Sequence, residues 1–173
     1  MCIRDSNYCD FYKHKLESQK QIEDFEELLI KQIRFHEDYL TENGFKMGSL
    51  DSFYIGGGTP SLWKLMGPEF LEGKFKLNHD CEFTIEVDPD TWTEEEVESW
   101  LALGVNRFSI GSQAYSQEYL KIMDRSHCLK DVEKTVKYFS ERKLNFSVDL
   151  MLGLPVKGAR DLRHELDGLL KYN

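Results

Sequence analysis

The sequence lacks three features that would each define a class of protein: a long apolar run, an excess of positive charge and an apolar signal segment. No stretch of 18 apolar residues occurs, which argues against a membrane-spanning helix. A formal net charge of −9 argues against phosphate-backbone binding as the main function, because nucleic-acid-binding domains usually present a basic face. We therefore expect a cytoplasmic protein with no membrane span and no nucleic-acid partner.

Cysteine and proline are also scarce, with four of each among 173 residues. In the absence of an export signal, the few cysteines predict reduced thiols rather than disulfides. No low-complexity segment or Pro/Gly/Ser-rich linker divides the chain. Its length therefore predicts one domain, and a hydrophobic content of 40% predicts a folded one.

Helical and strand periodicities alternate along the chain. We expect strands at 52–55, 82–87, 107–110 and 146–151, and helices at 18–44, within 67–75, and at 93–104, 116–123, 129–142 and 161–172. Strands that alternate with helices imply parallel strands joined by crossovers, with ligands at the carboxyl ends of the strands. The pattern predicts an α/β fold of four βα units after a leading helix, and both a barrel and an open doubly wound sheet are compatible with it.

Polar or glycine residues follow the apolar part of each predicted strand. They are Gly58, Glu86, Gln113 and Asp149. Because the carboxyl ends of parallel strands share one edge of a sheet, these residues predict a single site there.

The glycine triplet Gly56–Gly58 permits close approach of a ligand to the backbone, although a tight turn explains it equally well. Neither the dinucleotide-binding glycine pattern nor the phosphate-binding loop is present. Buried carboxylates need partners, so Glu86 and Asp149 either bind a polar or cationic ligand or form salt bridges with Arg107 or Arg125. Arg125 suits a ligand carboxylate, with a solvated surface arginine as the alternative.

Taken together, six segments resemble radical S-adenosylmethionine (SAM) proteins of the oxygen-independent coproporphyrinogen III oxidase type. The segments are 8–11, 56–61, 86–89, 104–113, 125–127 and 149–155, and they occur in the order of the family. The resemblance implies a partial parallel (β/α) barrel with a [4Fe–4S] cluster and SAM as cofactors. The cluster reduces the sulfonium of SAM to give a 5′-deoxyadenosyl radical, while the protein positions and shields the reactants.

The resemblance also implies roles for individual residues. Gly57, Gly58 and Thr59 correspond to backbone contacts with the methionine part of SAM, and Glu86 and Gln113 to side-chain contacts. Arg125 corresponds to a partner of the SAM carboxylate, and Asp149 to a contact on the adenosyl side. Cys2 and Cys9 correspond to the first and third cluster ligands, with Ser6 in place of the second. Serine is a poor substitute for a thiolate toward iron, which leaves open whether this chain holds a stable cluster.

Relative to the family, the sequence lacks a first strand, a sixth strand and a C-terminal domain. We therefore expect residues 1–173 to form a single incomplete radical SAM core from a longer protein, with residues 1–6 as a non-native start.

Phe11 stands where the oxidases have a further cysteine, which favours the haem-chaperone-like branch of the family. The motif Glu86-Val87-Asp88-Pro89 favours the oxidases instead. The expected function is haem binding and transfer to an acceptor protein. The alternatives are oxidative decarboxylation of coproporphyrinogen III propionates and an inactive fragment.

Overall fold

The computed structural model describes residues 17–46, 48–63, 75–154 and 160–172. Its elements in chain order are α1 (Gln19–Glu42), β1 (Leu50–Ile55), η1 (Pro60–Leu62), β2 (Leu77–Val87), α3 (Glu94–Ala102), β3 (Arg107–Gln113), α4 (Gln117–Ile122), α5 (Leu129–Glu141), β4 (Phe146–Leu150) and α6 (Leu162–Leu170). The predicted order of helices and strands is confirmed for these residues. The helix predicted within 67–75 falls almost entirely in 64–74, outside the described residues.

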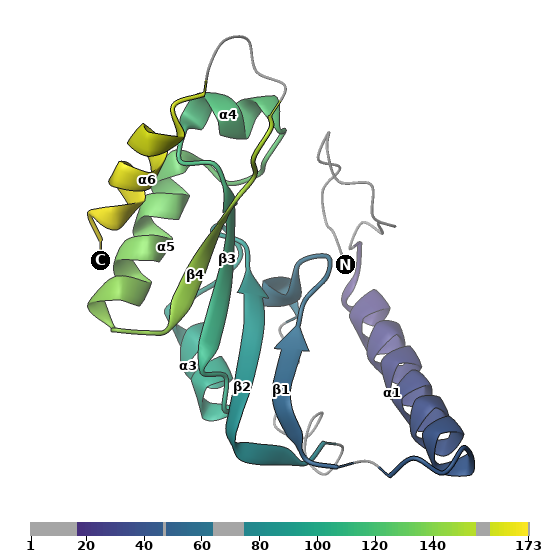
Figure 1. Cartoon of the computed structure of the whole chain (residues 1–173). Helices are drawn as coiled ribbons and strands as arrows, with labels where there is room; N and C mark the ends of the chain where they lie inside the picture. The colour runs from purple at the N-terminus through teal and green to yellow at the C-terminus, as the bar shows by residue number, and fades with distance from the viewer. Residues whose placement is uncertain (1–16, 47, 64–74, 155–159, 173) are drawn as a thin grey trace.

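The four strands form one parallel sheet in the order β1-β2-β3-β4 (Figure 1). Neighbours in the sheet are therefore neighbours in sequence, as crossover connections of one hand produce. The predicted parallel α/β fold is confirmed. All four strands consequently end at the same edge of the sheet.

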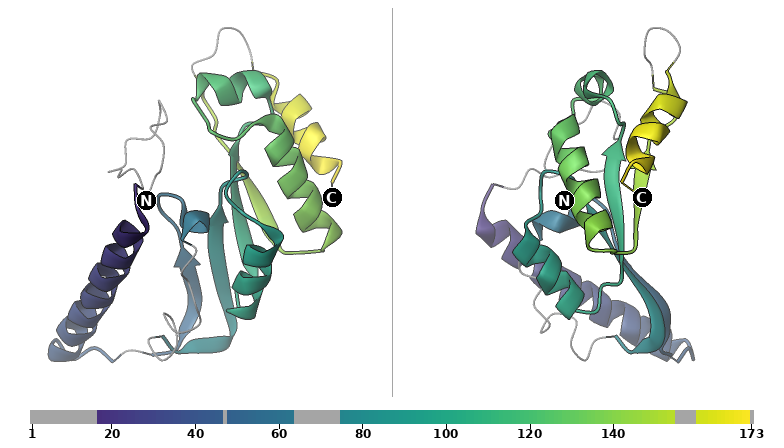
Figure 2. Two further views of the ribbon diagram at one scale, coloured as in Figure 1. Left: turned by 180° about the vertical axis from the view of Figure 1, so that it is seen from behind. Right: turned by 90° about the vertical axis from the view of Figure 1, so that its left-hand side faces the viewer.

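The main core lies between the sheet and helices α3 and α5. Alternate residues of the strands face these helices, and the largest fully buried side chains include Phe83, Ile85, Phe108, Ile110 and Phe139. Helix α5 turns Val132, Val136 and Phe139 inward, and all three are buried. A second cluster joins α4, α5 and α6 (Figure 2), so that helix packing braces the β3–β4 half of the sheet.

Helix α3 shows how local sequence sets an element. The Thr93 side chain accepts a hydrogen bond from the backbone of Glu96 at 3.2 Å, and the Glu96 carboxylate accepts one from the backbone of Thr93 at 2.8 Å. Gly104, with a φ of 97°, ends the helical segment. Between these ends, Val97 and Trp100 are buried against the sheet.

Helix α1 stands apart from the sheet (Figure 1). One face of this helix carries Leu29, Ile33, His36 and Leu40, which line a shared groove, but only Ile22 of the helix is buried. Trp63 contacts α1 through its indole, which donates to Glu26 at 2.6 Å, and Phe75 lines the same groove as the α1 residues. None of the described helices combines the length and apolarity of a membrane span.

Three strands are longer than predicted. β1 begins at Leu50 rather than residue 52. β2 begins at Leu77 rather than residue 82, and its first four residues are exposed. β3 continues through Gly111 and Ser112 to Gln113.

Candidate functional site

The two faces of the sheet differ in polarity. The face turned away from α3 and α5 carries Tyr54, Glu86, Ser109 and Asp149, each of which lies between apolar residues that pack into the core. The register places Ser109 beside Glu86 on one side and beside Ser147 on the other. These polar groups from four strands therefore meet near the carboxyl ends of the strands.

Glu86 links the first two strands to the glycine loop. Its Oε1 accepts a hydrogen bond from the Tyr54 hydroxyl at 2.8 Å, and its Oε2 accepts one from the Gly57 N–H at 2.9 Å. Burial raises the pKa of the Tyr54 phenol, and the hydrogen bond to Glu86 acts in the same direction. The phenol therefore stays protonated and remains a donor to the carboxylate.

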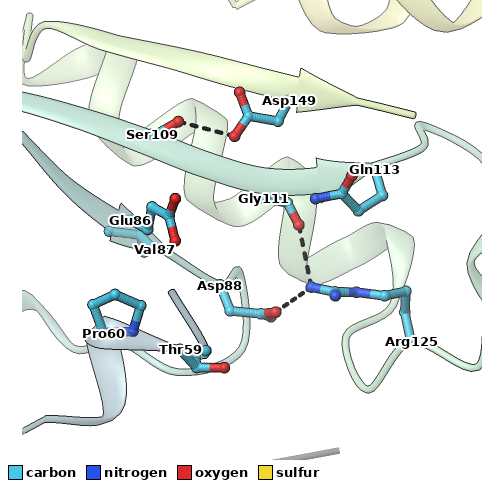
Figure 3. A pocket seen from close by; sticks show the side chains of 11 residues that line it. Thr59, Pro60, Glu86, Val87, Asp88, Ser109, Gly111, Gln113, Arg125 and Asp149 are labelled. Atoms are coloured by element: carbon cyan, nitrogen blue, oxygen red, sulfur yellow. Dashed lines mark hydrogen bonds and ion pairs between the residues drawn. The ribbon is translucent and has the colours of Figure 1, made fainter. Parts of the chain in front are cut away.

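Asp149 accepts a hydrogen bond from the Ser109 hydroxyl at 2.9 Å (Figure 3). The predicted alternative, a salt bridge to Arg107 or Arg125, is not found for Asp149 or Glu86 among the described residues. Arg107 instead donates to the hydroxyl of Ser147 at 3.2 Å. Two carboxylates held by neutral donors make this part of the site electronegative.

Arg125 is not a solvated surface arginine, because its side chain is only 15% exposed. Its guanidinium forms an ion pair with Asp88 and donates to the carbonyl of Gly111 at 3.3 Å. The sequence analysis missed Asp88 as a partner. Arg125 therefore reaches the site already oriented by the protein.

His127 completes this cluster from a fully buried position. Its Nδ1 lies 2.9 Å from Oδ1 of Asp88, and its Nε2 lies 3.1 Å from the carbonyl oxygen of Ser112. Burial works to raise the pKa of Asp88, but the hydrogen bond with His127 and the charge of Arg125 outweigh it and leave that pKa below its ordinary value. Asp88 is therefore an anion that fixes Arg125.

The glycine loop has the backbone conformations that its residues predict. Gly57 and Gly58 have φ values of 87° and 66°, in the left-handed region that glycine adopts readily. A Cβ on Gly56 would lie 2.4 Å from the Tyr54 ring and 2.8 Å from Oε1 of Glu86. The loop is thus a tight turn that also packs closely against the side chains of the site.

Gln113 ends β3 in an unusual conformation for a residue with a side chain, with a φ of 67°. Its amide is directed toward Gly111 on the cavity side of the strand (Figure 3). The backbone leaves the extended conformation at Gln113, and this change sets the direction of the Gln113 side chain.

A cavity of about 150 Å³ lies among these groups. Its lining consists of Gly58, Thr59, Pro60, Glu86, Val87, Asp88, Ser109, Gly111, Gln113, Arg125 and Asp149. The structure thus brings together all the predicted cofactor-binding residues except Gly57, which contacts Glu86 directly. Their roles toward a ligand stay predictions.

The predicted cluster ligands Cys2 and Cys9, together with Ser6, lie outside the described residues. Other residues that line the cavity were not predicted, because little in the sequence distinguishes them. Asp88 was marked only by its position after a strand and before Pro89, and Ser109 by the alternation of polar and apolar residues in β3.

A parallel sheet with a polar site at the carboxyl ends of its strands is a common enzyme architecture, and comparisons with known proteins identify the family. The Radical SAM superfamily model matches residues 1–167. The chain therefore belongs to the radical SAM superfamily.

Among curated relatives, the haem chaperone HemW of Escherichia coli is 32% identical over 179 residues, and that of Buchnera aphidicola (subspecies Schizaphis graminum) is 30% identical over 176. The match covers 99% of this chain and 46% of each relative, so the chain spans about half their length.

Among solved structures, coproporphyrinogen III oxidase (HemN) from Escherichia coli, described as a radical SAM enzyme, superposes with a TM-score of 0.81. The match covers 99% of this chain and 40% of that one, at 23% identity. It shows that the fold is the radical SAM fold, as predicted.

The described residues fit SAM chemically. SAM carries a sulfonium and an ammonium, which suit Glu86 and Asp149, and a carboxylate, which suits the guanidinium of Arg125. The left-handed glycine loop offers backbone groups at the same cavity. Membership of the superfamily implies SAM and a [4Fe–4S] cluster as cofactors.

Proposed function

We propose that the chain is the SAM-binding core of a radical SAM protein of haem metabolism, and that this protein binds and transfers haem. One observation carries the proposal: in a chain of this superfamily, a single cavity is lined by Glu86, Gln113, Arg125 and Asp149. The HemW relatives, which match nearly the whole of this chain, support the haem-chaperone assignment.

In this proposal, different residues bind different parts of SAM. The backbone of Gly58 and Thr59 binds the methionine part, while Gly57 ties this loop to Glu86, and Arg125, held by Asp88, faces the carboxylate. Glu86 and Gln113 contact the cofactor through their side chains, and Asp149, oriented by Ser109, lies on the adenosyl side. When bound, the reduced cluster and SAM supply a 5′-deoxyadenosyl radical, and the protein's part is to orient and enclose them.

The cluster ligands in this proposal are Cys2 and Cys9, with Ser6 between them. Anaerobic reconstitution with iron and sulfide tests this part directly. After one-electron reduction with dithionite, which makes the cluster paramagnetic, we expect the chain to give a weak or labile [4Fe–4S]+ signal in electron paramagnetic resonance. We expect Ser6→Cys to strengthen it, because a thiolate binds iron better than a serine hydroxyl. A full and stable signal from the unchanged chain would contradict the expected effect of Ser6.

A second candidate is oxygen-independent coproporphyrinogen III oxidase. Asp88, which precedes Pro89 as in the oxidases, favours it, and the structure places Asp88 at the site. The two candidates differ in the fate of the porphyrin. In the full-length protein carrying Ser6→Cys, the proposal predicts stoichiometric haem binding in an absorbance titration and no loss of carbon dioxide from coproporphyrinogen III. Multiple-turnover decarboxylation would overturn the chaperone assignment.

A further inference from the structure

A buried ion pair lies behind the cavity, and none of the roles above uses it. Arg160 and Glu165 have side chains that are only 7% and 2% exposed. Arg160 approaches the carboxylate with two nitrogens, Nε to Oε1 at 2.5 Å and Nη2 to Oε2 at 2.9 Å. This is the two-pronged geometry that a guanidinium makes with a carboxylate.

The pair also binds the ends of the two strands beside the cavity. Arg160 donates to the carbonyl of Met151, just after β4, and to the carbonyl of Gln113 at 3.4 Å. Glu165 accepts the N–H of Tyr115 at 2.6 Å. Among the described residues, the hydrogen-bond partners of these two side chains outside the pair are therefore backbone groups at or just beyond the carboxyl ends of β3 and β4, and the Arg160 guanidinium also lies over the ring of Tyr119, 5.3 Å from its centroid.

These partners surround Gln113 on both sides. Its carbonyl accepts bonds from Arg160 and from the N–H of Met151 at 2.9 Å, and Tyr115 lies two residues further along the chain. Gln113 is also the strand-end residue with a φ of 67°, a region that costs a residue with a side chain about 1 kcal/mol or more. Such a conformation persists where surrounding contacts over-determine it.

Stability alone is a poor explanation for the pair. Two charges removed from water gain little net free energy over apolar residues of the same volume, so the burial of this pair is weak evidence for a role in stability. The geometry imposed here is that of the loop that follows β3.

We propose that Arg160 and Glu165 are positioning residues that hold Gln113 in its left-handed conformation, so that its amide faces the cavity. Neither residue lines the cavity, and both act through Gln113 and the strand ends. The expected effect of the pair on SAM binding rests on the proposed function. Its expected effect on the backbone conformation of Gln113 does not.

The binding test is a double-mutant cycle on the 173-residue chain, with SAM titrated by calorimetry. Removing both charges together, as Arg160→Met with Glu165→Gln, avoids leaving one charge buried alone and keeps an acceptor for the Tyr115 N–H. We expect this pair of substitutions to weaken SAM binding about tenfold with Gln113 present and to have little further effect in a Gln113→Ala background.

The matched control is Arg142→Met with Glu98→Gln, which removes an exposed arginine–glutamate pair far from the cavity. It should leave SAM affinity unchanged. An equal loss of affinity with and without the Gln113 side chain, or no loss at all, would overturn the proposal. Circular dichroism of each variant confirms that the compared proteins are folded.

A second measurement does not depend on SAM. In the isotopically labelled chain, the coupling between the amide and α protons and the carbon chemical shifts of residue 113 report its φ. We expect left-handed values in the unchanged chain and extended values in the Arg160→Met, Glu165→Gln variant. If the unchanged chain binds no SAM, the proposed function fails, and this measurement still decides the positioning role. Left-handed values in the variant would overturn that role.

Discussion

The Gly57 N–H donates to Oε2 of Glu86 across 2.9 Å, so the carboxylate of β2 holds the loop that follows β1. The other carboxylate oxygen accepts the Tyr54 hydroxyl, which makes Glu86 the point where two strands and the glycine loop meet. A residue that orders the loop and faces the cavity affects ligand binding in two ways, directly through its charge and indirectly through the loop.

Glu86→Gln removes the charge while keeping the size of the side chain. We expect SAM affinity to fall about tenfold or more, because the cationic ligand loses its attraction to the Glu86 carboxylate. In addition, either the Tyr54 hydroxyl or the Gly57 N–H would then face the amide NH₂ of glutamine, which cannot accept its hydrogen bond. Unfolding in urea should show a loss of about 1 kcal/mol. Glu82→Gln on the same strand is the control, since Glu82 is 57% exposed and should change neither quantity. Unchanged SAM affinity in Glu86→Gln would contradict the site assignment.

Gly56→Ala tests the close packing beneath the loop. The added methyl group meets the Tyr54 ring and the Glu86 carboxylate at less than 3 Å, so both must shift. We expect a loss of about 1–3 kcal/mol in the free energy of unfolding, together with weaker SAM binding. Gly48→Ala is the matched control, because nothing lies within 4 Å of its Cβ. Equal stability of the two variants would show that the loop tolerates displacement.

Asp88 predicts a dependence of stability on pH. Its pKa in the folded chain lies below the ordinary value of 3.8. The stabilisation is therefore fully present above that value and is lost as the pH falls through the lower, folded-state pKa. We expect urea unfolding at decreasing pH to show a steeper loss of stability for the unchanged chain than for Asp88→Asn. If the unfolding free energies of the two proteins fall in parallel with pH, the contacts of ionised Asp88 with Arg125 and His127 do not stabilise the fold.

Phe139 joins the helix layer to the sheet. Its ring lies within 6 Å of the rings of Trp92, Phe108 and Phe146, in edge-to-face contacts. Phe139→Ala should cost about 3–5 kcal/mol of unfolding free energy in a urea titration. Phe35→Ala removes the same side chain where it is 64% exposed, and it should change stability by only about 0.5 kcal/mol. A small effect at Phe139 would contradict its place in the core.

The elements that the sequence predicted well are those whose determinants are local. The capping pair of Thr93 and Glu96 and the inward row of α5 depend on residues three or four apart. The site at the strand ends was predicted because the apolar part of each strand stops at a polar residue such as Glu86 or Asp149. In a parallel sheet, the carboxyl ends of the strands lie at the same edge.

The features that the sequence did not reveal depend on residues far apart. Asp88 and Arg125 are separated by 37 positions, and no periodicity connects them. Gln113 has a left-handed backbone because of bonds to Met151 and Arg160, not because of its own preference. On α6, Leu166 is 48% exposed whereas Glu165 is buried, the reverse of what the hydrophobicity of these residues indicates. Glu165 is buried because Arg160 neutralises it.

The central claim is that the cavity at the carboxyl ends of the sheet binds SAM. Calorimetric titration of SAM into the chain and into Asp149→Asn and Asp51→Asn variants tests it most directly, because Asp149 lines the cavity and Asp51 lies on the exposed part of β1. We expect binding of one SAM per chain, a loss of affinity of about tenfold or more in Asp149→Asn, and no change in affinity in Asp51→Asn. Absence of SAM binding, or equal affinities in all three proteins, would contradict it.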